Sequence, residues 1–189
     1  MIYSQVQLAT AKPQKISNPF TRSLRVIHGT IPQAIPHPAW GIDPGVNFGL
    51  TVIEGDKVFV MHGSLIQDDT PGRYGLIAYK FLQIMIGAYS HWGALLVIEG
   101  AAYGMPFRQV ELSELRTGFY LAASTYRVAP GDDTVRSMFS DVIIKPPAAI
   151  RKAVFGNGKT QAGDEWPTLN HNAADSLSMA LYAAQYQEE

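Results

Sequence analysis

The sequence has 189 residues, of which 47% are hydrophobic, and its 15 lysines and arginines nearly balance its 16 aspartates and glutamates. This length and composition indicate a folded domain with a full core, and they exclude a disordered tail, a collagen-like repeat and a disulfide scaffold. Cysteine is absent, which also excludes a thiolate metal site and a cysteine nucleophile. Apolar runs such as Ala94–Ile98 fall far short of the roughly 20 residues that cross a bilayer.

The charges are segregated along the chain. Residues 1–40 carry a net charge of +4, residues 41–100 carry −3, residues 101–159 carry +3 and residues 160–189 carry −5. Such segregation suits a surface that binds a polyanion beside an acidic pocket, although ordinary fluctuation of surface charge produces similar patterns.

The N-terminal segment differs from the rest of the chain. Residues 1–39 contain five prolines and no acidic residue. Because proline at this density prevents a long helix, we expect a basic, irregular arm over residues 1–39, with a short strand near Leu24–Ile27.

From Trp40 onward the pattern predicts alternating strands and helices. Strands are expected at 40–43, 48–53, 57–62, 94–98 and 142–144, and helices at 71–91, 107–124, 148–155 and from 169 onward. The first three strands form a meander, because Glu54-Gly55-Asp56 indicates a hairpin, and βα units follow. This order predicts an α/β protein with a mixed five-stranded sheet and helices on both faces.

Three carboxylates occupy unusual places in this pattern. Asp43 and Glu99 end apolar strands, and Asp175 lies near the start of the last helix. Singly, each has an ordinary explanation: an Asx-turn for Asp43, a core arginine partner for Glu99 and the helix dipole for Asp175. Together they would repel one another unless cations neutralised them, and oxygen ligands of this kind favour Mg²⁺ or Mn²⁺.

These residues belong to motifs that resemble the RuvC Holliday-junction resolvases, which are nucleases with the RNase H-like fold. The motifs are Gly41-Ile42-Asp43-Pro44-Gly45, Val97-Ile98-Glu99, Asn172-Ala173-Ala174-Asp175-Ser176-Leu177, and Val142–Lys145 followed by Arg151–Gly156. The resemblance covers about residues 40–186, and it implies an RNase H-like nuclease domain over residues 40–189. It also implies that Asp43, Glu99 and Asp175 are metal ligands. The family has Asp or His where this chain has Asn172, so the fourth ligand is either Asn172 or the neighbouring His171.

Several basic and aromatic residues are candidates for contact with DNA. By the resemblance, Arg151 falls where a lysine of the family assists at the scissile phosphate, and Lys152 is adjacent to it. Lys159 is a candidate second cation, Arg108 and Arg116 are candidates for flanking phosphates, and Tyr103 is a candidate for stacking on an unpaired base. Each of these side chains also has a purely structural explanation, either solvation of an exposed face or packing.

Gly156-Asn157-Gly158-Lys159-Thr160 looks like the end of a phosphate-binding loop. The first glycine of that pattern is replaced by Ala153, so we expect no nucleotide cofactor.

The resemblance therefore implies an endonuclease that resolves four-way DNA junctions with two Mg²⁺ or Mn²⁺ ions per active site. Paired nicks require a homodimer, for which the helix at 107–124 is the candidate interface unless it packs internally. The alternatives are a broader nuclease acting on branched or flap DNA and a junction-binding module without catalysis. We expect no membrane association and a cytoplasmic location in a bacterial or phage-infected cell, with an organelle as the alternative.

Overall fold

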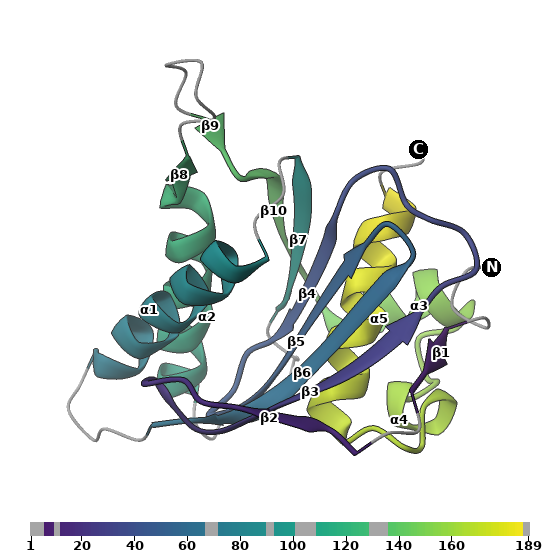
Figure 1. Cartoon of the computed structure of the whole chain (residues 1–189), viewed down its shortest axis with the longest axis horizontal. Coiled ribbons are helices and arrows are strands. Elements are labelled where there is room, and N and C mark those ends of the chain that lie inside the picture. Colours follow the sequence, from purple (N-terminus) through teal and green to yellow (C-terminus); the bar gives the residue numbers. More distant parts are fainter. Residues whose placement is uncertain are drawn as a thin grey trace.

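The computed structural model describes residues 6–9, 12–66, 72–89, 93–100, 109–128 and 136–186. A twisted eight-stranded sheet forms the centre of this part of the chain, with helices on both faces (Figure 1). The strands of the sheet are β1 (Gln7–Leu8), β2 (Gln14–Ile16), β3 (Thr21–Thr30), β4 (Ala39–Asp43), β5 (Asn47–Glu54), β6 (Lys57–Leu65), β7 (Ala94–Glu99) and β10 (Phe139–Lys145). A separate two-stranded pair consists of β8 (Arg127–Val128) and β9 (Arg136–Ser137). The helices are α1 (Arg73–Ala88), α2 (Gln109–Thr125), α3 (Pro147–Phe155), α4 (Ala162–Glu165) and α5 (His171–Tyr186).

The strand order is β1-β3-β6-β5-β4-β7-β10, and β2 also pairs with β3. The segment from β3 to β4 is antiparallel throughout, whereas β7 runs parallel to both β4 and β10. The helices α1 and α2 cover one face of the sheet, and α5 covers the other with α3 and α4 beside it (Figure 1). The mixed sheet with helices on both faces confirms the predicted fold class.

The strands predicted after residue 40 are β4, β5, β6, β7 and β10, but the sheet is larger than the five strands expected. The additional strands β1, β2 and β3 come from the N-terminal segment that we expected to be mostly irregular, and β3 alone spans ten residues. The prolines of this segment lie before, between or after these strands, so they exclude a helix without preventing sheet formation. Between the helix predicted at 107–124 and the strand predicted at 142–144, the chain also contains β8, β9 and the start of β10, which were not expected.

The β3 strand belongs to the core, because Leu24 is fully buried and Val26 is 1% exposed. We therefore expect Leu24→Ala to lower the free energy of unfolding by about 2–5 kcal/mol, the usual range for a buried leucine. Urea unfolding measures this change, with the exposed β2 variant Gln14→Ala as the control. A loss no larger than that of the control would mean that residues 1–39 contribute little to the core.

Helix α5 lies unusually close to the strands beneath it. A Cβ atom on Gly41 would lie 2.2 Å from the Ser176 carbonyl oxygen, and one on Gly49 would lie 1.9 Å from the Asn172 carbonyl oxygen. The hydroxyl groups of Thr51 and Ser176 are hydrogen-bonded at 2.8 Å across the same interface. The absence of a side chain at Gly41 and Gly49 therefore allows α5 to pack close to β4 and β5.

No helix in the described part of the chain is both long enough and apolar enough to cross a membrane.

Candidate active site

The structure brings the three predicted carboxylates together at one edge of the sheet. In the parallel pairing of β4 with β7, Ile42 is opposite Ile98, so Asp43 and Glu99 end adjacent strands. Both face the side of the sheet that α5 covers, because their neighbours two residues back, Gly41 and Val97, pack on that side. The third carboxylate, Asp175, belongs to α5 and is only 5% exposed.

The pKa values of all three carboxyl groups are raised, and burial is the largest cause in each case. Burial raises the pKa of Asp43 well above its usual value, and the hydrogen bond to Glu99 and the charges of Glu99 and Asp175 add to this effect. Burial also raises the pKa of Glu99 and that of Asp175, against the opposing effect of nearby cations. The site therefore concentrates negative charge that a proton or a cation must offset.

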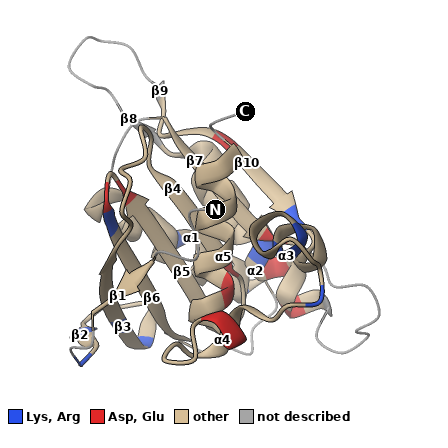
Figure 2. Ribbon diagram, turned by 90° about the vertical axis from the view of Figure 1, so that its right-hand side faces the viewer, with Lys and Arg blue, Asp and Glu red and all other residues tan. Residues whose placement is uncertain are grey.

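Two basic side chains contact Asp175. A terminal guanidinium nitrogen of Arg151, on α3, lies 3.6 Å from one carboxylate oxygen, and Nε2 of His171 lies 3.4 Å from the other. In Figure 2, segments coloured for Lys or Arg and for Asp or Glu both occur around α3. Because the His171 side chain is 74% exposed, it contacts both the acidic site and solvent.

Asn172 has a different environment from His171. Its side-chain amide donates a 2.7 Å hydrogen bond to the backbone carbonyl of Asn47, which ties the first turn of α5 to β5. Of the two candidates for a fourth ligand, only His171 is in contact with an acidic side chain of the site.

The start of α5 is fixed by a capping residue. The side-chain oxygen of Asn170 accepts a hydrogen bond from the backbone N–H of Ala173, as an N-cap does, and its amide nitrogen lies 2.7 Å from Nδ1 of His62. Burial and the charge of Arg25 lower the pKa of His62, which favours the neutral ring that can accept this hydrogen bond. These contacts, which the sequence analysis did not foresee, fix where α5 begins and hence where Asp175 lies.

Arg116 reaches the site from α2, on the opposite face of the sheet. Its guanidinium donates hydrogen bonds to the backbone carbonyls of Glu99 at 3.0 Å and Gly100 at 3.3 Å. Its charge lowers the pKa values of Asp43 and Glu99 against the effect of burial. Arg116 was predicted to contact DNA, and in this structure it anchors the end of β7.

The remaining candidates lie further out or outside the described residues. Lys152 and Lys159 are exposed, on α3 and in the turn after it. The predicted DNA contacts Arg108 and Tyr103 lie outside the described residues. Lys145, which was not singled out, ends β10 directly opposite Glu99 in the register and on the same face. Its position at the end of a strand was the signal that could have identified it.

Within the described residues, no three histidine, aspartate or glutamate side chains form a ready group of metal ligands. The chemistry of the donor set nevertheless fits a divalent cation, since three converging carboxylates carry an excess of negative charge in a buried position. Binding a cation would require these carboxyl groups to be deprotonated.

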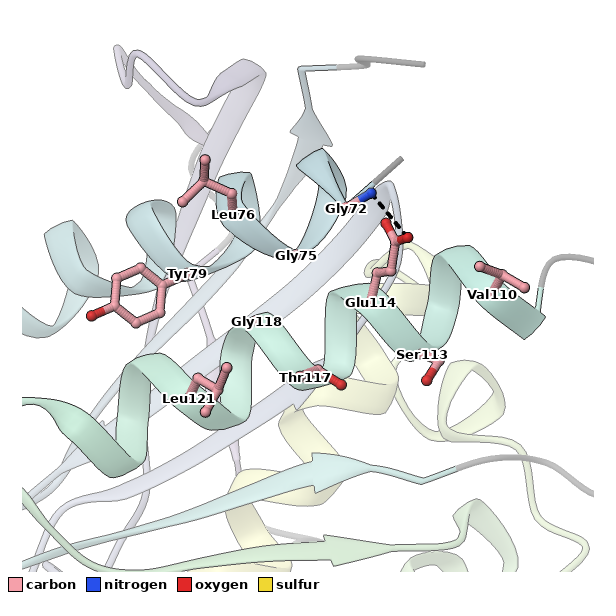
Figure 3. Close-up of a pocket in the computed structure, with 10 residues that line it drawn as sticks. All are labelled: Gly72, Gly75, Leu76, Tyr79, Val110, Ser113, Glu114, Thr117, Gly118 and Leu121. Atoms are coloured by element: carbon pink, nitrogen blue, oxygen red, sulfur yellow. Dashed lines mark hydrogen bonds between the residues drawn. The ribbon is translucent and has the colours of Figure 1, made fainter. Parts of the chain in front are cut away.

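A groove lies on the opposite side of the molecule, between α1 and α2. Its volume is about 730 Å³, and Leu76, Tyr79, Val110 and Leu121 are among the residues that line it (Figure 3). At its floor the helices nearly touch, because a Cβ on Gly118 would lie 2.1 Å from the carbonyl oxygen of Gly75. Leu76, Val110 and Leu121 are 48%, 73% and 46% exposed, so this face of the molecule is apolar.

The sheet order, the helices on both faces and the acidic residues at the ends of adjacent parallel strands define an α/β fold of the RNase H-like class. No protein-family model and no curated protein matches the sequence. Among solved structures, the chain is similar to the Thermus thermophilus RuvC structure, with a TM-score of 0.51 and 18% sequence identity over 80% of this chain and 95% of that chain. It is also similar to T. thermophilus RuvC in complex with Holliday junction substrate, with a TM-score of 0.52 and 14% identity over the same shares. The resemblance to RuvC inferred from the motifs is thus confirmed at the level of the fold.

Proposed function

We propose that this protein is a divalent-metal-dependent endonuclease that cleaves four-way DNA junctions. The observation that carries the proposal is the convergence of Asp43, Glu99 and Asp175 at the ends of two parallel strands and the first turns of α5. The fold shared with RuvC supports it, and one of the two similar structures is a complex with Holliday junction substrate.

Asp43, Glu99 and Asp175 would hold two Mg²⁺ or Mn²⁺ ions, and the contact of His171 with Asp175 favours His171 over Asn172 as the additional ligand. Bound ions of this kind supply an activated water and neutralise the leaving oxygen of a phosphodiester. The protein's own cations have separate roles. Arg151 positions Asp175 and, with Lys145 across from Glu99, provides positive charge for the scissile phosphate. Lys152 and Lys159 extend this positive charge along the substrate.

Arg116 serves the reaction indirectly in this scheme. By holding the carbonyls of Glu99 and Gly100, it fixes the backbone at the end of β7 and therefore the position of the Glu99 carboxylate. Because two of its nitrogens donate these bonds, we assign it a positioning role, and the phosphate contact expected from the sequence stays a prediction.

A nicking assay tests the proposed function. The substrates are a labelled synthetic four-way junction and a linear duplex of the same sequence, each with Mg²⁺ and with EDTA. We expect paired nicks in opposed strands of the junction only, and only with Mg²⁺. Equal cleavage of forks and flaps would indicate a broader nuclease, and tight binding without nicks under any metal would indicate a junction-binding module.

Paired nicks require two active sites, and we propose a homodimer formed through the apolar groove between α1 and α2. We expect Leu76→Glu to shift the protein from dimer to monomer in sedimentation velocity, because it places a charge in this groove. On the junction, Leu76→Glu should then nick one strand without the paired nick in the opposed strand. The control is Tyr186→Glu, which changes a residue of similar exposure at the end of α5. A wild-type protein that sediments as a monomer at all concentrations would contradict this interface.

A further inference from the structure

A row of side chains crosses the sheet from the carboxylates to the N-terminal strands. In the strand register Asp43 is opposite Gly49, Gly49 is opposite His62, His62 is opposite Arg25, and Arg25 is opposite Lys15. Residues opposite each other in antiparallel strands share a face of the sheet. Arg25 and Lys15 therefore lie on the same face as the active-site carboxylates.

Helix α5 divides this row into a covered part and an open part. Its first turn packs on Gly49, and its N-cap Asn170 contacts His62. Arg25 and Lys15 lie beyond that point, and both are exposed. Figure 2 shows lysine and arginine residues on β2 and β3, and they are separate from those on α3. Two basic surfaces thus flank the start of α5, one on α3 beside Asp175 and one on the N-terminal strands.

The charge of the second surface is not neutralised locally. Residues 1–40 include Lys12, Lys15, Arg22 and Arg25 and no acidic residue. Within the described part of the chain, neither Lys15 nor Arg25 forms an ion pair. Uncompensated cations aligned across a flat strand surface complement the regularly spaced negative charges of a nucleic-acid backbone.

The spacing of the row can be compared with DNA. Adjacent strands are about 4.8 Å apart, so Arg25 is about 14 Å and Lys15 about 19 Å across the sheet from Asp43. A duplex rises about 3.4 Å per base pair, so these distances correspond to about four and six base pairs.

We propose that Arg25 and Lys15 bind the sugar–phosphate backbone of one duplex arm of the substrate, about four to six base pairs from the phosphate that is cut. This inference rests on the proposed function for the position of the cut. The N-terminal strands then serve as a docking surface that holds the arm while the carboxylate site acts on the crossover. Its contacts are with phosphates, so it contributes affinity and orientation and carries no sequence preference.

The first test measures the salt dependence of junction binding by fluorescence anisotropy in EDTA, where no cleavage occurs. Each duplex phosphate contact contributes about 0.9 to the slope of log K against log salt. We expect the double variant Lys15→Ala/Arg25→Ala to reduce the slope by about 1.8 per bound protomer and to weaken binding at low salt. The charge-preserving pair Lys15→Arg/Arg25→Lys should retain the wild-type slope. Lys57→Ala, at the other end of β6, is the matched control and should also retain it.

The second test removes the charge from the DNA. A junction carrying methylphosphonates about four to six base pairs from the cut site should bind wild-type protein as weakly as the double variant binds unmodified DNA. The double variant should lose no further affinity on the modified junction. When the methylphosphonates lie about ten base pairs from the cut site instead, the wild type should again bind the junction more tightly than the double variant does.

The outcomes separate this proposal from the proposed function. Normal cleavage with an unchanged salt slope in the double variant would overturn the docking surface and leave the nuclease intact. Duplex and junction binding that depends on Lys15 and Arg25, without any nicking, would retain the docking surface and overturn the nuclease. A wild-type protein that binds neither the junction nor the linear duplex would overturn the docking surface outright.

Discussion

Replacing Asp43 with asparagine is expected to lower Mg²⁺-dependent junction cleavage by about 100-fold or more, because the variant loses a charged ligand at the centre of the site. The variant should still fold and bind the junction, since asparagine preserves the shape of the side chain and the N-terminal and α3 cations are unchanged. The nicking assay and the binding assay in EDTA measure the two properties separately. The control is Asp56→Asn in the exposed β5–β6 turn, which should cleave like wild type.

The same substitution should make the metal-free protein more stable near neutral pH. The pKa of Asp43 is raised on folding, so the native state binds more protons than the unfolded state between the ordinary and the raised value. The stability of the wild type therefore falls as pH rises through that window, and an uncharged asparagine at this position removes part of this loss. We expect the melting temperature in EDTA at pH 7 to be higher for Asp43→Asn than for wild type, with a smaller dependence on pH.

Magnesium should reverse this ranking. Binding of Mg²⁺ to the native wild type alone stabilises it increasingly as the ion concentration rises, whereas Asp43→Asn should show little shift. If the wild type gains no stability from Mg²⁺ or Mn²⁺ at any concentration, these carboxylates are not a metal site. An Asp43→Asn protein that cleaves normally would lead to the same conclusion.

Adding a single methyl group at Gly41 is expected to damage both the fold and the site. In Gly41→Ala the new Cβ would meet the Ser176 carbonyl oxygen at 2.2 Å and the Ala180 backbone nitrogen at 2.4 Å, so α5 must move. We expect a loss of about 3 kcal/mol in the free energy of unfolding, at the upper end of the usual cost of overpacking. Because Asp175 moves with α5, cleavage should fall even where the protein remains folded.

Urea unfolding and the Mg²⁺ dependence of cleavage check this expectation. Gly163→Ala in α4 is the matched control, because a Cβ there would meet no atom within 4 Å. Equal free energies of unfolding for Gly41→Ala and Gly163→Ala would show that α5 does not pack directly on β4.

The positions of the three carboxylates followed from the sequence because simple rules determine them. An apolar run that ends in an acid places that acid at the end of a buried strand, and parallel strands bring such ends to one edge of the sheet. Asp43 and Glu99 obey this rule, and the spacing of the last helix places Asp175 above them. Their role in binding metal remains a prediction, as do the roles of Arg151 and Lys152.

Other features depend on contacts between distant residues and were not predictable. The alternation of Leu24 and Val26 indicated a strand, but its partner β6 lies more than thirty residues further along the chain. Similarly, Arg116 looks like any cation on a helix until the sheet brings the carbonyls of Glu99 and Gly100 within its reach. The spacing of residues in the sequence carries no signal for a hydrogen bond to a distant backbone carbonyl.

The short strands β1 and β2 have a consequence for how copies of this protein meet. They pair with β3 at Gly29–Thr30 and Leu24–Val26, which covers five of the ten residues along the outer backbone edge of this strand. An uncovered edge of that length would invite pairing with the edge of another molecule and growth into aggregates. With part of that edge occupied by two short strands, copies of the protein are less able to pair through β3.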